Sequence, residues 1–366
     1  MKRFPTHAAE ERLRSLGIEP VPLHGTPAPA LPPHVVDAVA TALGRPAAAP
    51  PPRGQAALRE ALAAELARTT GRATDPEREI LVTHGAMQAL GVVFRSLLEP
   101  GDEVVVQTPC FFFEAPIRAA GGSPTFVFAR KGGWTWDADA IERALGPRTR
   151  ALVLCNPENP TGHLLSREEI AAVVNVADRH GLLVVTDEAY EAAIWGDGVL
   201  SSAYPASERA LVVRSLGKSL AMPHLRLGLV AGSADLVERC AVSFEWDCLR
   251  VGVASQAAAL AALTGPREWL AQVRERLARD RAVALELVAR TPGLEVVAPA
   301  GGPFLFLTAL DRRPTLADEL VRVGLPAVDG AEFRAPGYAR LPFGGAHEAR
   351  DALERALAAW AEAHVE

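Results

Sequence analysis

The stretch Arg214-Ser-Leu-Gly-Lys-Ser-Leu-Ala-Met-Pro-His-Leu-Arg-Leu-Gly228 is the segment around which the rest of the chain is organised. A short apolar run, Ala210 to Val213, precedes it and is typical of a buried strand. Within the stretch, Lys218 stands among small residues, between the hydroxyl of Ser215 and the guanidinium of Arg226. This spacing suits an amine held near an anion, although a solvated surface loop would carry the same residue types. The segments upstream decide between the two interpretations.

The composition is that of a soluble globular protein with a sizeable core. The 366 residues are 49% hydrophobic and 22% charged, and this length predicts one large and one smaller domain. A formal net charge of -6 does not suit nucleic-acid binding, which needs a basic face. The sequence contains neither a signal-peptide pattern nor an apolar run of membrane-spanning length. We therefore expect a cytoplasmic protein that binds neither nucleic acid nor membrane, and the scattered cysteines predict no metal site.

From Ile80 onward, short apolar strands alternate with helices. The segments that have the composition of strands are Ile80–Val82, Glu103–Gln107, Pro124–Phe128, Ala151–Cys155, Leu182–Val185 and Ala210–Val213. Ser166-Arg-Glu-Glu169 is a capping box that predicts the start of one of the intervening helices. This pattern predicts an α/β fold with a mainly parallel sheet covered by helices on both faces. Ligands bind such sheets at the carboxyl ends of the strands, where the polar motifs of this chain lie.

The flanking segments predict a smaller α+β domain beside the sheet. Residues 1–34 are rich in proline and lack sustained periodicity, so we expect an arm or a part of the small domain. Residues 35–262 would form the large domain, and residues 263–366 would form the small one. Before the sheet, Gln55–Arg68 predicts a helix with leucines on its buried face and charged residues, Arg59 among them, on its exposed face.

Several motifs stand in a fixed order along the chain. They are Thr83-His-Gly-Ala-Met-Gln-Ala-Leu90, Asn156-Pro-Glu-Asn-Pro-Thr-Gly162, Thr186-Asp-Glu-Ala-Tyr190, the stretch around Lys218, and Gly337-Tyr-Ala-Arg-Leu-Pro-Phe343. With these motifs the chain resembles the fold-type I pyridoxal 5'-phosphate (PLP) enzymes of the class I/II aminotransferase family. The resemblance runs from about Leu23 to Phe343. It implies PLP bound as a Schiff base to Lys218 and transfer of an amino group between an α-amino acid and a 2-oxo acid.

The resemblance implies a role for each polar motif around the cofactor ring. Asp187 would keep the pyridine nitrogen protonated, which makes the ring an electron sink. Tyr190 and Asn159 would hydrogen-bond the ring hydroxyl, and Phe111 would stack on the ring. Together with Lys218, which would also move a proton, Asp187 and Tyr190 are the expected catalytic residues.

The same resemblance implies a phosphate site. Gly85, Ala86 and Met87 stand at the expected start of a helix, where free N–H groups and the helix dipole bind anions. Ser215 and Arg226 match the side-chain ligands of the phosphate, and the planar arginine fork suits phosphate oxygens.

Two further residues are expected to bind the substrate. Arg340 matches the arginine that pairs with the α-carboxylate of the substrate in this family, and Gly25 matches a glycine of the N-terminal arm that approaches the same group. Arg334 is close to Arg340 in the sequence, but its context matches less well.

The chain also departs from the family pattern. The family usually has a tyrosine that reaches the partner subunit's phosphate at the position occupied here by Ala49. Arg53 and Arg250 are candidate replacements, although both would also fit solvated loop positions. The resemblance implies a homodimer with active sites shared between subunits.

Three functional interpretations remain open from the sequence. The motifs favour an aminotransferase, but they would also serve a PLP-dependent lyase, decarboxylase or cyclising enzyme. A non-catalytic PLP-binding regulator would need a DNA-binding module, for which residues 1–34 are too short and too rich in proline. The substrate side chain is open, since Phe111 and Trp195 favour an uncharged one and Arg250 favours an acidic one.

Overall fold

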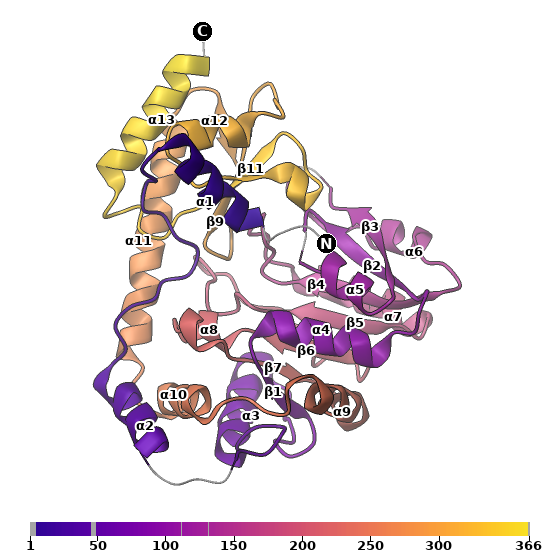
Figure 1. The fold of residues 1–366 in the computed structure, drawn as a ribbon. Coiled ribbons are helices and arrows are strands. Elements are labelled where there is room, and N and C mark those ends of the chain that lie inside the picture. The colour runs from indigo at the N-terminus through magenta and orange to yellow at the C-terminus, as the bar shows by residue number, and fades with distance from the viewer. Residues whose placement is uncertain (1–4, 45–48, 111, 131, 365–366) are drawn as a thin grey trace.

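The computed structural model describes residues 5–44, 49–110, 112–130 and 132–364 (Figure 1). Within these residues, the larger sheet has seven strands in the order β1-β7-β6-β5-β4-β2-β3. Strands β2 to β6 pair in parallel, whereas β7 is antiparallel to both of its neighbours. The strands are β1 Ile80–Thr83, β2 Glu103–Thr108, β3 Ser123–Phe128, β4 Thr149–Cys155, β5 Leu183–Asp187, β6 Ala210–Arg214 and β7 Gly228–Ala231. The predicted, mainly parallel α/β sheet is therefore confirmed.

Helices cover both faces of this sheet. Side chains alternate between the two faces along each strand, so each strand contributes apolar side chains to a core on either face. Val104 and Val106 face a core shared with α3, α4, α5, α9 and α10, whereas Val105 faces a core shared with α6 and α7. The helices on the first face are α3 Ala56–Thr70, α4 Ala86–Leu97, α5 Glu114–Ala119, α9 Ala234–Cys248 and α10 Val253–Thr264. Those on the second face are α6 Ala138–Arg143 and α7 Arg167–Arg179, and α7 begins with the predicted capping box of Ser166 and Glu169.

A second, antiparallel sheet has four strands among the described residues, in the order β10-β11-β9-β8. Its strands are β8 Leu294–Val296, β9 Phe304–Ala309, β10 Val328–Asp329 and β11 Tyr338–Pro342. The helices α11 Glu268–Arg290, α12 Leu316–Arg322 and α13 Arg350–His364 accompany it, and α11 runs along the molecule beside both sheets (Figure 1). This sheet confirms the smaller α+β part, while the exact boundaries at residues 34 and 262 stay a prediction.

The N-terminal segment, expected to be an arm or a part of the small domain, packs against the elements of the small sheet and contains a helix that the sequence did not predict. It contains the helix α1, Pro5–Leu16, which packs against α12 and β10. Leu13 is almost fully buried in the core of the small sheet. Tertiary packing rather than a strong local pattern thus holds this helix. A second helix, α2 Pro33–Gly44, packs against α10.

The predicted exposure of Arg59 is wrong. Its side chain on α3 is buried, with 4% exposed, while the predicted leucines of the same helix are buried as expected. The Arg59 guanidinium donates to the carbonyls of Pro76 (2.7 Å) and Gly54 and forms an ion pair with Glu77 at 2.6 Å. Loop carbonyls therefore accept the hydrogen bonds of the buried guanidinium. The hydrophobic periodicity of the helix sequence cannot predict these partners, because they lie outside the helix.

The register of the central strands determines where the functional side chains lie. Asp187 at the end of β5 pairs with Cys155 of β4 on one side and with Val213 of β6 on the other. The loops that follow these three strands therefore leave the sheet at one edge, as the parallel pattern requires. No helix in the described part of the chain has the length and hydrophobicity that a membrane span needs.

Candidate active site

Lys218 lies at the carboxyl edge of the large sheet. It belongs to the short helix α8, Leu216–Ser219, which follows β6 directly. The backbone carbonyl of Ser215, just before this helix, accepts a hydrogen bond from the Lys218 N–H at 2.9 Å. The Lys218 Nζ atom lies 3.7 Å from the centroid of the Tyr190 ring. The turn after β6 thus directs the amine towards the loop that follows β5.

Asp187 brings a carboxylate close to this amine. Only 7% of the residue is exposed, and its Oδ1 atom accepts a hydrogen bond from the Ala189 N–H at 2.9 Å. Burial raises the pKa of Asp187, and the positive charge of Lys218 opposes that increase. The end of β5 therefore holds a buried carboxylate that a neighbouring cation stabilises in its ionised form.

Tyr190, Asn159 and Arg340 form a continuous series of contacts between the two sheets. The Asn159 Nδ2 atom donates to the Tyr190 hydroxyl at 3.4 Å, and the Arg340 Nη1 atom donates to Asn159 Oδ1 at 3.0 Å. The ring of Phe304 on β9 meets the Tyr190 ring edge to face at 5.7 Å. Lys218, Asp187, Asn159, Tyr190 and Arg340, which the sequence predicted as site residues, therefore come together.

Arg340 and Arg334 have different surroundings. Arg340 on β11 is 4% exposed and its Cζ atom lies 4.3 Å from the centroid of the Phe304 ring. Burial lowers the Arg340 pKa to about 10, so the guanidinium stays charged at neutral pH. Arg334 forms an ion pair with Glu114 at 2.6 Å and lies 3.5 Å above the Phe126 ring. Only Arg340 contacts the other predicted site residues through these interactions.

The start of α4 and the loop before β7 lie close together and form a cradle, at the place where the sequence predicts a phosphate site. A Cβ atom on Gly85 would lie 3.1 Å from Arg226 Nη2, and one on Gly228 would lie 2.9 Å from Ala86 N. The first N–H groups of a helix, here those of Ala86 and Met87, have no partner within the helix. Arg226 itself is exposed and adopts a left-handed conformation. Gly85, Ala86, Met87 and Arg226, four of the predicted phosphate residues, thus lie together around the start of one helix.

The remaining predicted residues have mixed outcomes. Gly25 lies against the small sheet, because a Cβ atom there would come within 2.9 Å of Phe304 Cε1. Phe111 lies outside the described residues, so its predicted stacking stays a prediction. Arg53 interacts with Glu238 and with the Arg78 carbonyl, and Arg250 donates to the Pro50 carbonyl at 3.2 Å. These contacts do not connect either arginine to Lys218 in this chain.

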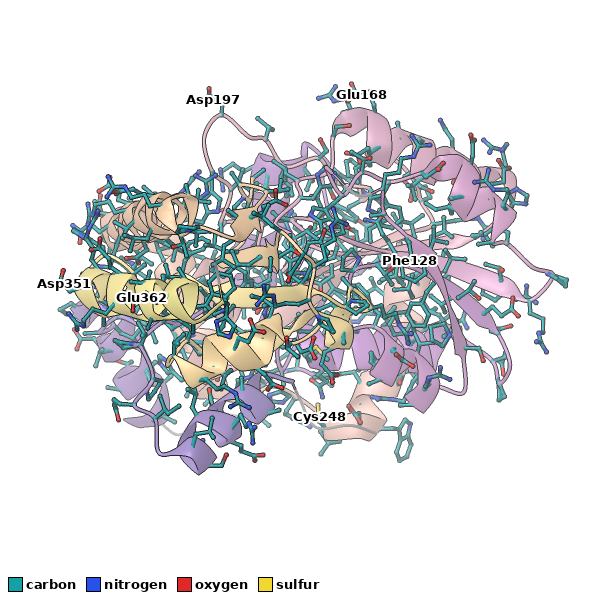
Figure 2. All side chains as sticks on the ribbon, turned by 90° about the horizontal axis from the view of Figure 1, so that it is seen from above. Phe128, Glu168, Asp197, Cys248, Asp351 and Glu362 are labelled. Atoms are coloured by element: carbon teal, nitrogen blue, oxygen red, sulfur yellow. The ribbon has the colours of Figure 1, made fainter. Side chains whose placement is uncertain are left out.

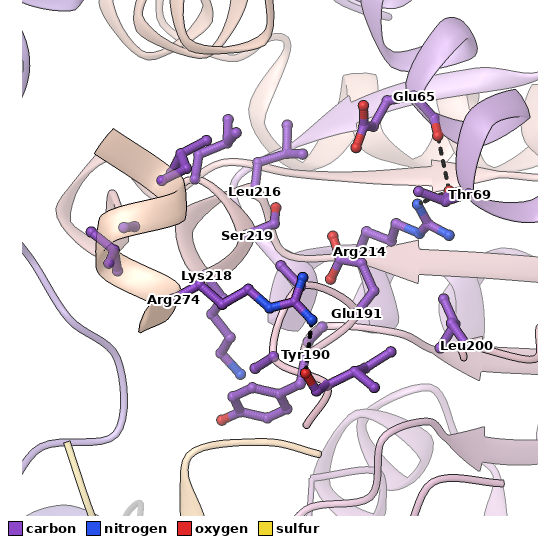
Figure 3. Close-up of a pocket in the computed structure, with 18 of the residues that line it drawn as sticks. Glu65, Thr69, Tyr190, Glu191, Leu200, Arg214, Leu216, Lys218, Ser219 and Arg274 are labelled. Atoms are coloured by element: carbon purple, nitrogen blue, oxygen red, sulfur yellow. Dashed lines mark hydrogen bonds between the residues drawn. The ribbon is translucent and has the colours of Figure 1, made fainter. Parts of the chain in front are cut away.

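A cavity of about 570 Å³ opens beside Lys218 (Figure 3). Gly25, Tyr190 and Lys218 line one part of it, and Glu65 and Arg214 line another. Its walls come from α3, α8, α10, α11 and the loop after β5. Its volume lies within the range of about 300–1,000 Å³ that is common for small-molecule sites.

Sequence reasoning missed Glu158, which lies next to Asn159. Glu158 is 4% exposed and accepts hydrogen bonds from Gln107, from Thr161 Oγ1 (2.8 Å) and from Trp136 Nε1 (3.2 Å). Burial raises its pKa to about 7. The position of Glu158 inside the Asn156–Gly162 motif was the one signal in the sequence that could have identified it. Its partners Gln107 and Trp136 could not be predicted, because they belong to segments that are distant in the sequence.

A buried ion pair beneath the site was also missed. Arg214 and Glu188, which are 2% and 0% exposed, pair with 2.8 Å between Nη2 and Oε2. Glu188 follows Asp187 and Arg214 precedes Ser215, so the pair holds together the ends of two strands that carry site residues. Breaking a buried pair of this kind typically costs about 3–5 kcal/mol.

Comparison with known proteins identifies similar chains. The model of the family "Aminotransferase class I and II" matches residues 22–359. A probable aspartate/prephenate aminotransferase of Thermus aquaticus is 34% identical and covers 97% of this chain and 96% of its own length. An arginine–pyruvate transaminase of Pseudomonas aeruginosa is 35% identical over 83% of this chain and 80% of its own. The structure of Thermus thermophilus aspartate aminotransferase with maleate superposes with a TM-score of 0.90 at 33% identity, covering 97% and 96% of the two chains.

Proposed function

This chain belongs to the aminotransferase class I and II family and exchanges an amino group between an amino acid and a 2-oxo acid, and we propose that it does so with PLP held at Lys218. The observation that carries this proposal is the series of contacts from Lys218 through Tyr190 and Asn159 to Arg340. It brings an amine and a buried guanidinium into one site, which supports the roles proposed for them.

The residues around Lys218 fit PLP. A dianionic phosphate needs N–H donors and a cation, which the start of α4 and Arg226 would supply around the cradle at Gly85. Ser215 would add a hydroxyl donor. A pyridine nitrogen needs a buried anion to stay protonated, and Asp187 has that character. The ring hydroxyl would be held by Tyr190 and Asn159, as the family resemblance implies.

Lys218, Arg340 and Gly25 would each have a separate role in the reaction. Bound PLP supplies an electron sink for the electron pair released when the Cα–H bond of the substrate breaks. The Lys218 Nζ atom would accept that proton from Cα and would then donate it to the C4′ atom of the cofactor. Arg340 would hold the α-carboxylate by a charge-assisted pair, so that the Cα–H bond points towards Lys218. Gly25, which has no side chain, would leave room for that carboxylate beside Phe304.

The relatives suggest a first pair of substrates. Several of them are named aspartate aminotransferases, so we propose aspartate and 2-oxoglutarate as the first donor and acceptor to assay. Other relatives are named for arginine with pyruvate or for N-succinyldiaminopimelate, which makes a wider panel necessary. We also propose that the enzyme is a cytoplasmic homodimer, as the family resemblance implies.

The test is a transamination assay of the PLP-loaded protein. Each of the common amino acids is incubated with pyruvate, oxaloacetate or 2-oxoglutarate, and both products are identified by mass spectrometry. Formation of the matched new amino acid and 2-oxo acid supports the proposal. Release of carbon dioxide, of ammonia or of a cyclic product without amino transfer would instead favour a decarboxylase, lyase or cyclising enzyme.

A further inference from the structure

Glu158 is a buried ionisable group that the proposed reaction does not use. Its carboxyl group accepts hydrogen bonds from Gln107, from Trp136 Nε1 at 3.2 Å and from Thr161 Oγ1 at 2.8 Å. Removing a carboxyl group from water is costly, and burial raises the pKa of Glu158 to about 7. These contacts hold the side chain in one orientation despite that cost, directly before Asn159 in the chain.

Glu158 belongs to a closed ring of hydrogen bonds. Trp136 Nε1 donates to Glu158, and the Trp136 backbone N–H donates to Glu169 Oε1 at 2.9 Å. Glu169 Oε1 in turn contacts His163 Nε2 at 3.0 Å. The His163 backbone N–H donates to Thr161 Oγ1 at 3.1 Å, and Thr161 Oγ1 donates to Glu158. The ring therefore joins the loop before α6, the start of α7 and the loop after β4.

The backbone of Glu158 fixes the same loop. Its N–H donates to the His163 carbonyl at 2.8 Å, and its carbonyl accepts from the Gly162 N–H at 2.9 Å. The side chain adds a link to the large sheet, because Gln107 lies near the carboxyl end of β2. The chain immediately before Asn159 is thus held through both the backbone and the side chain of one residue.

Asn159 is the residue at which this ring meets the site. Its Nδ2 atom donates to the Tyr190 hydroxyl at 3.4 Å, and its Oδ1 atom accepts from Arg340 Nη1 at 3.0 Å. The nitrogen and the oxygen are attached to the same carbon, so both contacts require one orientation of the amide. Asn159 is only 2% exposed, which leaves little access for water to replace a lost partner. A shift of the loop would therefore change both contacts together.

The ionisable groups that face Glu158 come from several elements. Burial opposes the charges of His163 and Glu169, but the hydrogen bond between them raises the pKa of His163 and lowers the pKa of Glu169. The thiols of Cys110 and Cys155 also face Glu158, and burial raises the pKa of both, so they are neutral at neutral pH. Because Glu158 and His163 titrate themselves, the role of Glu158 is tested by comparing variants at each pH.

We propose that Glu158 is a positioning residue for Asn159 and that, through Asn159, it sets how tightly the linkage between Lys218 and the cofactor holds its proton. The inference rests on the proposed function, which puts the ring hydroxyl of PLP beside Tyr190 and Asn159. A donor on that oxygen would compete with the N–H of the linkage for the same lone pairs. A well-placed Asn159 would therefore lower the proton affinity of the linkage, and a displaced one would raise it.

The test is a pH titration of the visible absorbance of the PLP-loaded protein, which reports protonation of the linkage. Glu158→Ala should raise the pKa of the linkage by about half a unit to one unit, the effect of losing one ordinary hydrogen bond. Glu158→Gln should restore most of the wild-type value, because its amide can still accept from Trp136 and donate to Thr161. Glu168→Ala, beside the ring residue Glu169 but at the surface (Figure 2), is the matched control and should titrate like the wild type.

An Asn159→Ala background separates positioning from a general effect on the fold. In that background Glu158→Ala should cause no further rise, because the residue through which it acts is absent. Thr161→Val keeps the shape of its side chain and cuts the ring at another place, so it gives the same measurement if Glu158→Ala does not fold. An unchanged linkage pKa in both ring variants, or equal rises with and without Asn159, would overturn the inference. A wild type that gains no visible absorbance with PLP would overturn the proposed cofactor site on which the inference rests.

Discussion

Arg340 and Arg334 are close in sequence, yet burial and partners separate their chemistry. Arg340 contacts Asn159 and the face of Phe304, whereas Arg334 is half-buried in a pair with Glu114. A guanidinium that contacts a site amide is suited to bind a substrate carboxylate, while a guanidinium with its own carboxylate is not. In the sequence, only the family resemblance ranks Arg340 above Arg334. The contrast that supports this ranking is structural, because Arg340 lies within β11 and Arg334 follows the turn Gly330–Phe333.

We predict that Arg340→Ala retains PLP absorbance and loses activity towards amino acids. The loss in transition-state binding should be about 2–5 kcal/mol, since one partner of a buried charged pair is removed. Titration with PLP and steady-state kinetics measure the two effects separately. Arg340→Lys should recover only part of the activity, because an ammonium lacks the planar fork.

Arg334→Ala is the matched control for that substitution. It breaks the partly exposed pair with Glu114, so kcat/KM should stay within a few-fold of the wild type. Loss of PLP from Arg340→Ala, or an equal fall in kcat/KM in both variants, would show that Arg340 does not bind the substrate.

At the scale of elements, the strands of the large sheet could be predicted because each is a short, continuous apolar run between polar turns. Helix α1 could not, because its burial depends on α12 and β10, which are distant in sequence. The burial of Arg59 is a similar case, since the carbonyls it binds belong to loops outside its helix. Local patterns therefore predicted the elements better than they predicted the contacts between them.

Glu158 shows how elements are joined beneath the site. Its carboxyl group links Gln107 in β2, Trp136 before α6 and Thr161 in the loop after β4. The same loop carries Asn159, so this network positions a site residue. The nearby His163 and Glu169 form their own pair at 3.0 Å.

The raised pKa of Glu158 predicts a pH-dependent stability. In the folded protein this pKa is about 7, above the ordinary value of 4.5, so the folded state binds the proton more tightly. The contribution to stability is fully present below pH 4.5 and is lost as the pH rises through 7. The pKa of Glu158 in the folded state lies about 2.5 units above its ordinary value, and each unit is worth about 1.4 kcal/mol. The whole contribution to the free energy of unfolding is therefore about 3 kcal/mol.

The substitution Glu158→Gln removes this titration while keeping a polar group of the same shape. Relative to the wild type, the variant should gain unfolding free energy between pH 5.5 and 8.5, as measured by urea denaturation. Glu168→Gln, at an exposed position on α7, is the control and should show no such gain. The prediction fails if the difference between wild type and Glu158→Gln does not change with pH.

At the scale of the whole molecule, the two sheets contribute different parts of one site. The large sheet supplies Lys218, Asp187, Tyr190 and Asn159, and the small sheet supplies Arg340. The anion cradle at α4 lies on the large-sheet side and includes the exposed Arg226. Parallel strand ends made the first group predictable from sequence, but the approach of β11 to Asn159 required the structure.

The proposed homodimer has a candidate contact surface on α9. Val242 and Trp246 of this helix and Leu249 just after it are spaced along one face and are 51%, 91% and 62% exposed. Figure 2 shows Cys248, at the end of the same helix, at the surface of the molecule. Exposed apolar groups in such a row are typical of a protein interface.

We therefore expect dimers in solution that depend on this surface. Light scattering after gel filtration should give twice the chain mass of 38.8 kDa for the wild type. Trp246→Glu should shift the protein towards the monomer, because a charge would be buried without a partner. Leu310→Glu, at another exposed apolar position, should remain dimeric. A monomeric wild type would contradict the homodimer, and a dimeric Trp246→Glu would exclude this surface.

The central claim is that Lys218 holds the cofactor, and the small number of lysines makes it directly testable. The chain contains only Lys2, Lys131 and Lys218. The PLP-loaded protein is reduced with borohydride, digested, and mapped by mass spectrometry, with Lys131→Arg as a control that should label normally. The account predicts one pyridoxyl-phosphate group, on the peptide that contains Lys218, and none in Lys218→Ala. Label on Lys2 or Lys131, or none on a protein that binds PLP, would contradict it.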